Sequence, residues 1–138
     1  MVYIPKILRQ EVIERARGLC EYCQTSQLIV IALQIDHILP IALGGQTKID
    51  NLCLACEFCN GHKNDQIQAL DPKSNSVQKL FNPRTQIWND HFQWDETSTI
   101  IIGLTPTGRA TIEKLRMNDT TIVRAREIWI LTGLHPPK

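Results

Sequence analysis

The sequence predicts an α+β fold with a small core of two strands and one helix. Two Cys-x-x-Cys pairs, Cys20–Cys23 and Cys56–Cys59, enclose a stretch in which short extended segments are expected. Apolar residues recur at helical spacing before the first pair and again towards the carboxyl end of the chain. Runs rich in β-branched residues lie between these helical patterns, as in strands. The chain is therefore expected to contain both helices and strands, and its two cysteine pairs can come together at one site.

Length and composition are those of a small globular protein. The 138 residues suit one compact domain, or a small core with an extension, and 43% of them are apolar. No apolar run approaches the length of a membrane-spanning helix, so no membrane partner is expected. Pro5, Lys6, Arg9 and Glu11 stand where a signal peptide would be apolar. With cysteines at metal-ligand spacing, this favours the reducing cytoplasm and a bound metal over disulfides.

The first cysteine pair follows a predicted helix over Pro5–Gly18, in which Pro5 fits the first helical position and Gly18 the stop. In a Cys-x-x-Cys turn both sulfurs, here of Cys20 and Cys23, can reach one tetrahedral zinc ion. A redox pair is the alternative, but it would need a preceding strand and a following helix. Here a helix precedes and a β-branched run follows, which favours zinc.

The segment after the first pair is predicted to be extended. Leu28–Leu33 reads as a strand that continues through Ile38 and ends at Pro40. Because neighbouring side chains of a strand point to opposite faces, Asp36 and His37 are expected to diverge unless a bend re-aims one of them.

The second half of the core is predicted to be a loop, a strand and a helix. Gly44-Gly45 makes a turn in a polar loop, and Asn51–Ala55 forms the second strand. After the knuckle at Cys56–Cys59, Asn60 is expected to open a helix that runs to about Ala69. We therefore divide the chain into a core at residues 1–70 and an extension at residues 71–138.

The extension is predicted to begin with a polar linker or surface loop and to pack on the core. Trp88, Phe92 and Trp94 are interpreted as core residues rather than as a platform for stacking bases. Its regular elements are predicted to be a strand at Thr99–Leu104, a helix from Thr105-Pro106 to about Met117, and a helix over Thr120–Thr132 capped by Asp119.

The four paired cysteines are predicted to form one structural zinc site. Four thiolates fill the tetrahedral shell of zinc and leave no position for a water molecule. Cys53 is the odd cysteine and is interpreted as a small buried residue. In a small core, such a metal contributes on the order of 10 kcal/mol to folding.

The residues between the cysteine pairs have the chemistry of a phosphodiesterase. A histidine with its ordinary pKa of about 6.5 can accept a proton from water near neutral pH, which makes His37 a candidate general base. Asp36 offers a carboxylate and Asn60 an amide oxygen to a hard divalent ion such as Mg²⁺. Each residue also has a structural interpretation: His37 as a core histidine, Asn51 as a turn cap and Asn60 as a helix cap.

The whole stretch resembles the HNH endonuclease motif, in the form found in short stand-alone bacterial proteins. The resemblance covers about Leu19–Asp65, a third of the chain, and its parts occur in order. They are Asp36-His37, Ile38-Leu39-Pro40, Gly44-Gly45, Asn51-Leu52 and Cys56-x-x-Cys59-Asn60-x-x-Lys63, with Cys20 and Cys23 upstream.

The resemblance implies a zinc-braced ββα-metal core, similar to a treble clef, with an N-terminal helix and a C-terminal strand-plus-helices extension. It implies an enzyme that hydrolyses phosphodiester bonds in double-stranded DNA with Mg²⁺ or Mn²⁺. His37 matches the base, Asp36 a ligand of the catalytic ion, and Asn51 the residue that orients the base or braces the loop. Asn60 stands where the family has histidine or asparagine. Lys63 is then a candidate contact to substrate phosphate, and His62 a further candidate metal ligand.

Charge leaves alternatives open. The net charge of +1 is low for a nucleic-acid-binding domain, although residues 109–138 carry 6 basic and 3 acidic side chains and are the more plausible DNA-facing segment. A non-catalytic zinc module that binds nucleic acid or a protein partner would suit this charge. A degenerate nuclease kept as a binding unit is a third reading, against which the intact Asp36, His37, Asn51 and Asn60 argue. Cleavage specificity, oligomeric state and biological pathway are not indicated.

Overall fold

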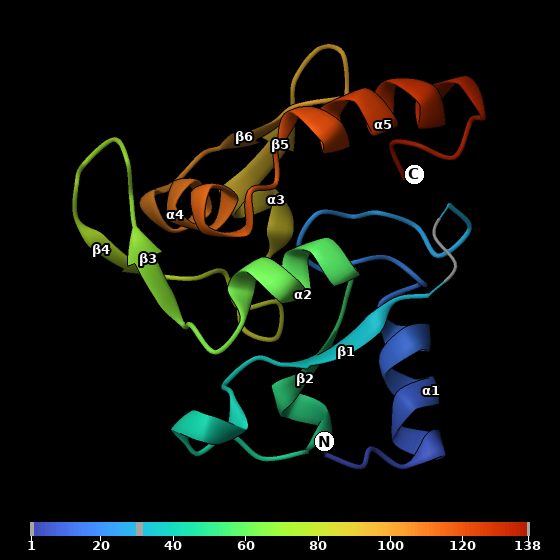
Figure 1. The fold of residues 1–138 in the computed structure, drawn as a ribbon, viewed down its shortest axis with the longest axis vertical. Coiled ribbons are helices and arrows are strands. Elements are labelled where there is room, and N and C mark those ends of the chain that lie inside the picture. Colours follow the sequence, from blue (N-terminus) through green and yellow to red (C-terminus); the bar gives the residue numbers. More distant parts are fainter. Residues whose placement is uncertain (1, 30–31, 138) are drawn as a thin grey trace.

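The computed structural model describes residues 2–29 and 32–137, and within them the chain is α+β. The described strands pair into three small antiparallel two-stranded sheets, β1–β2, β3–β4 and β5–β6. In chain order the elements are α1 (Lys6–Arg15), β1 (Gln34–His37), β2 (Leu52–Ala55), α2 (Glu57–Lys63), β3 (Gln68–Leu70), β4 (Val77–Lys79), α3 (Trp88–His91), β5 (Phe92–Trp94), β6 (Ile101–Gly103), α4 (Pro106–Leu115) and α5 (Thr120–Leu131) (Figure 1).

Strand β2 is buried on both faces and organises the core. Leu52 and Leu54 pack with Val12 and Ala16 of the α1 segment, whereas Cys53 and Ala55 face the cysteine pairs and the extension. This alternation follows from the two-residue period of a strand. Helix α1 thus covers one side of the β1–β2 hairpin, and α2 and the extension lie on the other (Figure 1).

The divergence of Asp36 and His37 is confirmed. Strand β1 is regular, with Asp36 opposite Cys53 and His37 opposite Leu52. Because paired residues share a face, Asp36 points to the cysteine side and His37 to the α1 side. Strand β1 ends at His37, which lets both side chains still border the space beyond it.

The prediction of a strand at Leu28–Leu33 is wrong for the four of its residues that the structure describes. Leu28 and Ile29 lie in a turn, Ala32 and Leu33 lie in no regular element, and residues 30–31 fall outside the described residues. The N–H of Ile29 donates to the carbonyl of Ser26 at 3.0 Å, which closes the chain reversal after the first knuckle. The partner strand β2 spans only four residues, and Gln34–His37 already fill its ladder.

The helix predicted from Asn60 to about Ala69 is shifted and too long. Helix α2 begins at Glu57, after Cys56, whose Sγ accepts a hydrogen bond from the N–H of Cys59. Asn60 therefore sits within the helix and does not cap it. The helix ends at Lys63 because Asn64 adopts a positive φ of 51°.

A β3–β4 hairpin spans the start of the segment predicted as a linker: its turn and β4 lie in that segment, and β3 overlaps the end of the helix predicted to reach Ala69. Its turn is built by Asp71, whose carboxylate accepts hydrogen bonds from the N–H groups of Lys73 and Ser74 and from the Ser74 hydroxyl. The side chains of β3 and β4 are exposed or half-buried, so the sequence lacks the apolar alternation by which strands are predicted.

The remaining predicted elements of the extension are confirmed, with shorter ends. Thr105 caps α4, with Pro106 in the first turn, and its hydroxyl accepts from the N–H of Gly108 at 3.0 Å. Asp119 caps α5 through the N–H of Thr121. Phe92 is fully buried in the main core, and Trp88 and Trp94 pack against it.

The extension holds the first cysteine knuckle directly. Arg84 forms an ion pair with Glu21. Trp88 Nε1 donates to the carbonyl of Tyr22 at 2.7 Å, and Trp94 Nε1 to Gln24 at 3.0 Å. The cysteine pairs therefore lie inside the molecule, between its two halves. None of the described helices is long and apolar enough to cross a membrane.

Candidate functional site

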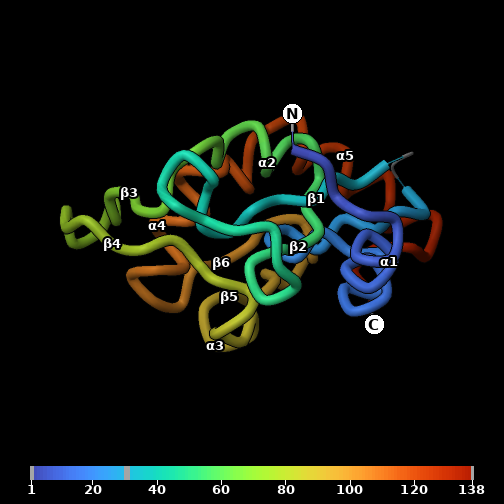
Figure 2. Tube along the Cα trace, turned by 90° about the horizontal axis from the view of Figure 1, so that it is seen from below, coloured from blue at the N-terminus to red at the C-terminus, as the bar shows by residue number. Residues whose placement is uncertain are grey.

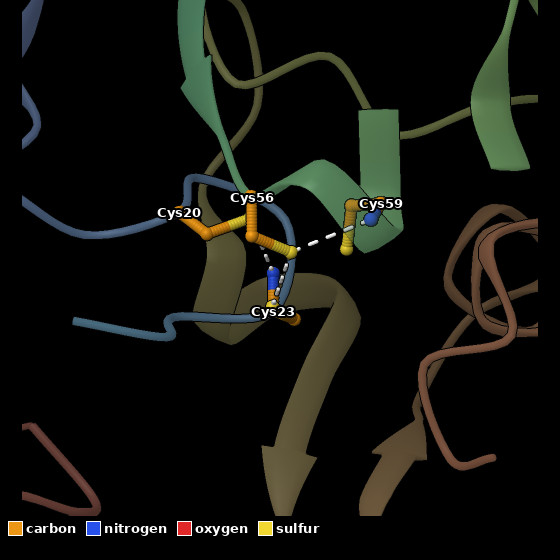
Figure 3. A group of neighbouring side chains, drawn as sticks. All are labelled: Cys20, Cys23, Cys56 and Cys59. Carbon is orange, nitrogen blue, oxygen red and sulfur yellow. Dashed lines mark hydrogen bonds between the residues drawn. The ribbon is translucent and has the colours of Figure 1, made fainter. Parts of the chain in front are cut away.

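The four paired cysteines come together in one buried cluster. Cys20 and Cys23 come from the first knuckle, and Cys56 and Cys59 from the junction of β2 and α2 (Figure 3). All four Sγ atoms lie within 4.8 Å of one another, and those of Cys23 and Cys56 are 3.6 Å apart. Tetrahedral zinc with Zn–S bonds of about 2.3 Å places its sulfurs roughly 3.8 Å apart. The cluster therefore has the dimensions of a site that can hold zinc.

Local hydrogen bonds shape both knuckles for an ion. The N–H of Cys23 points at the Sγ of Cys20, at 3.5 Å, and the N–H of Cys59 at the Sγ of Cys56, at 3.4 Å. Hydrogen bonds from Cys20, then from Cys56 and Cys59, hold the pKa of the Cys23 thiol well below its ordinary value. The thiolate is the form of cysteine that binds zinc.

A second site lies beyond the end of β1. A cavity of about 440 Å³ is bordered by β1, by the loop that follows it and by α2. Three of the sequence-predicted residues, Asp36, His37 and Asn60, line it together, although they come from two elements. The remaining lining residues are Ile35, Pro40, Ile41, Ala42, Gly61, Asn64 and Asp65.

The Asp36 carboxylate is buried and held from two directions. Tyr22 Oη donates to Asp36 Oδ2 at 3.0 Å, and Lys63 Nζ forms an ion pair with the same oxygen at 3.1 Å. Lys63 also donates to the carbonyl of His37 at 3.2 Å, and its side chain is only 2% exposed. Lys63 thus contacts both members of the Asp36-His37 pair from within the protein. Asp36 Oδ1 has no protein donor within residues 2–29 and 32–137.

The His37 ring is oriented by a residue from the following loop. His37 Nε2 lies 2.8 Å from Thr47 Oγ1. When the threonine hydroxyl accepts this hydrogen bond, the proton resides on Nε2, and Nδ1 keeps a free lone pair. In that tautomer His37 can accept a proton at Nδ1 and so act as a base there.

Asn51 holds the loop that carries Thr47. Its side chain accepts from the N–H of Leu39 at 2.8 Å and donates to the carbonyls of Leu39 and Gln46 at 3.0 and 2.9 Å. These three bonds tie both ends of the 39–46 segment to the start of β2. Asn51 does not line the cavity.

The other predicted residues take different places. Asn60 Nδ2 donates to Gln34 Oε1 at 2.6 Å, and Asn60 Oδ1 has no donor in the described part of the chain. His62 lies 2.8 Å from the carbonyl of Phe58, on its own helix, and does not border the cavity. Cys53 is a fifth, separate thiol; it is fully buried, and burial raises its pKa.

Three contributors to the site were not predicted from the sequence. Thr47 contacts His37, Gln34 contacts Asn60, and Tyr22 contacts Asp36. The position of Tyr22 between Cys20 and Cys23, which can hold a metal ion, could have indicated a buried role. Thr47 and Gln34 carry no such signal, because their contacts depend on how the loop and the strand fold.

Comparison with known proteins identifies the segment that holds both sites. Residues 20–66, about a third of the chain, match the family described as HNH endonuclease. No curated protein and no solved structure gives a match. The resemblance seen in the sequence is thus confirmed over the cysteine cluster and the cavity, and the α+β fold with its four-cysteine site agrees with an HNH core.

Proposed function

We propose that the protein is a metal-dependent HNH endonuclease that hydrolyses phosphodiester bonds in double-stranded DNA. The observation that carries the proposal is that Asp36, His37 and Asn60 line one cavity in the segment that matches the HNH family. A base and two oxygen ligands beside one open space are what metal-assisted hydrolysis requires.

The donor set fits a hard divalent ion such as Mg²⁺ or Mn²⁺. Asp36 would bind through Oδ1, since Tyr22 and Lys63 engage Oδ2. Asn60 would bind through its amide oxygen, since its nitrogen already donates to Gln34. With so few protein ligands the ion keeps several positions for water and phosphate, as Mg²⁺ commonly does. When bound, such an ion neutralises charge on the scissile phosphate and stabilises the leaving oxygen.

In this proposal His37 takes a proton from the attacking water through Nδ1. Thr47 holds the opposite ring nitrogen, and Asn51 holds the loop that positions Thr47. Lys63 forms an ion pair with Asp36 and joins the backbone of His37 to α2, so it is a positioning residue here and not a contact to phosphate. Zinc in the cysteine cluster would fix the knuckle from which Tyr22 reaches Asp36.

One observation favours the alternative of a non-catalytic zinc module. The Asp36 carboxylate is buried, ion-paired and hydrogen-bonded within the protein, as in a network that serves structure alone. In that case no divalent ion would enter the cavity, and the zinc-braced surface would bind nucleic acid or a protein.

Nicking of supercoiled plasmid separates the two functions. Wild type should nick in Mg²⁺ or Mn²⁺, lose activity in EDTA and regain it when the divalent ion is restored, with zinc content measured throughout. His37→Ala should lose at least 100-fold in rate, the lower range for loss of a general base. His91→Ala, which removes an imidazole bound to Thr105 outside the cavity, is the matched control. A folded, zinc-loaded wild type that cuts no form of DNA would overturn the proposal.

A further inference from the structure

A second cavity adjoins the first at β1. It encloses about 450 Å³ between the N-terminal arm, α1, β1 and α2. It shares Ile35, His37 and Asn60 with the first cavity, so the two meet at the histidine. Its other lining residues are Val2, Ile4, Arg9, Leu33 and Gln34. The N-terminal end of the chain lies near β1 and α2 (Figure 2).

Arg9 supplies a cationic side chain to this second cavity, and the fold directs it there. Its Nε donates to the carbonyl of Ile4 at 3.1 Å. Ile4 is itself buried against Val12 of α1 and Leu52 and Leu54 of β2, which anchors the arm. The bond to Ile4 uses only Nε. The two terminal nitrogens of Arg9 have no protein partner within residues 2–29 and 32–137, and the residue is exposed.

The two cavities differ in charge. Asp36 and Asp65 line the first, which suits a cation. Arg9 lines the second, and none of the described residues in its wall carries a carboxylate; the amide of Gln34 lies there as well. A guanidinium with two free N–H₂ groups is suited to bidentate binding of phosphate oxygens. A strand of DNA with one phosphate at His37 would have neighbouring phosphates on either side.

The basic residues of the extension are less available than their number implies. Arg126 is fully buried and donates to the carbonyls of Thr99 and Met117. Arg109 is engaged by Asp71 through two hydrogen bonds. Arg124, on α5, is exposed and lies outside the walls of both cavities.

We propose that the second cavity binds the DNA backbone beside the scissile bond, with Arg9 contacting a non-scissile phosphate. This inference rests on the proposed function and extends it by naming the surface that positions the substrate. The N-terminal arm and α1 are then part of the DNA-binding site, although they lie outside the matched segment 20–66.

The test is DNA binding, measured without cleavage. Fluorescence anisotropy of a labelled duplex would be followed over a range of KCl concentrations, with Ca²⁺ in place of Mg²⁺. Losing one phosphate contact should weaken binding about tenfold near 0.1 M salt and reduce the slope of log K against log[salt] by about 0.9. Arg9→Gln should show both changes. Arg9→Lys should recover the slope, because it restores the charge, and Arg124→Gln should behave as wild type.

Wild-type affinity and slope in a folded Arg9→Gln protein would overturn the inference and leave the nuclease proposal standing. Loss of slope in Arg124→Gln alone would overturn it too, by assigning the contact to the extension. If wild type binds no DNA under any of these conditions yet is folded and zinc-loaded, the proposed function fails and the inference with it.

Discussion

At the scale of single residues, the site depends on side chains that fix the orientation of others. Asp36 can present one oxygen to the cavity because Tyr22 and Lys63 hold the other. Lys63 is buried, and its ammonium forms an ion pair with Asp36 and a hydrogen bond with the carbonyl of His37. Removing one partner of a buried ion pair commonly costs about 3–5 kcal/mol, so Lys63 is as much part of the fold as of the site.

The hydroxyl of Tyr22 is predicted to support binding of the catalytic ion. Tyr22→Phe removes the hydroxyl that donates to Asp36 and keeps the buried ring. The outer contacts of a metal ligand typically contribute about 10–100-fold to metal affinity or activity. We therefore expect the Mg²⁺ concentration that gives half-maximal nicking to rise at least about tenfold, while zinc content stays at wild-type level.

Mn²⁺ binding, followed by electron paramagnetic resonance, gives a readout that does not depend on cleavage. It should weaken in Tyr22→Phe by a similar factor. An unchanged Mn²⁺ affinity in a folded, zinc-loaded variant would mean that Tyr22 does not orient a ligand of the catalytic ion.

At the scale of elements, what the sequence reveals depends on how local the determining contacts are. The knuckles were predictable because a two-residue spacing alone brings the sulfurs of Cys20 and Cys23 together. The caps of α4 and α5 were predictable because each capping side chain contacts a backbone N–H only two or three residues away. The β3–β4 hairpin was not, because its strands lack apolar alternation and the hairpin is held to α4 by the contact of Asp71 with Arg109, 38 residues away. The end of α2 at Lys63 rests on one positive φ at Asn64.

Asp71 and Arg109 give an element-scale prediction about pH. Hydrogen bonds from Arg109 hold the pKa of the Asp71 carboxyl well below its ordinary value, and the pair ties the β3–β4 hairpin to α4. An aspartate in the unfolded chain titrates at about pH 3.9. Since the folded pKa is the lower one, the pair stabilises fully above that pH, and the stabilisation is lost as pH falls towards the folded pKa.

Thermal unfolding of wild type and Asp71→Asn across pH measures this contribution. Wild type should have the higher Tm from neutral pH down to about pH 5, and the difference should shrink steadily below about pH 4. Zinc content is measured at each pH, and the two proteins are compared at the pH values where both retain it. A difference in Tm that stays constant down to about pH 2 would contradict the role assigned to this pair.

At the scale of the whole molecule, the cysteine cluster joins the two halves of the chain. Residues of both halves, among them Cys20, Cys59, Phe92 and Leu115, belong to one buried cluster. The sequence predicts a core and an extension but gives no sign of a shared interior, because the contacts of Arg84, Trp88 and Trp94 with the knuckle span more than 60 residues. We therefore propose that zinc stabilises the extension as well as the HNH segment.

Cys59→Ala tests this at the level of folding. Loss of one ligand should prevent tight zinc binding and remove most of its contribution to stability, on the order of 10 kcal/mol. We expect the tryptophan fluorescence of the extension and the far-ultraviolet circular dichroism to report unfolding together. Cys53→Ala, which removes a buried thiol outside the cluster, should keep its zinc and fold. A well-folded, zinc-free Cys59→Ala protein would refute this coupling.

Chemical rescue by imidazole tests directly whether His37 acts as the base of a metal-dependent nuclease. Plasmid nicking by His37→Ala would be measured in Mg²⁺ with increasing imidazole, beside wild type and a sample without divalent ion. We expect wild type to nick, His37→Ala not to nick, and imidazole to restore part of the rate of the variant only when Mg²⁺ is present. A His37→Ala protein that nicks as fast as wild type without imidazole would contradict it.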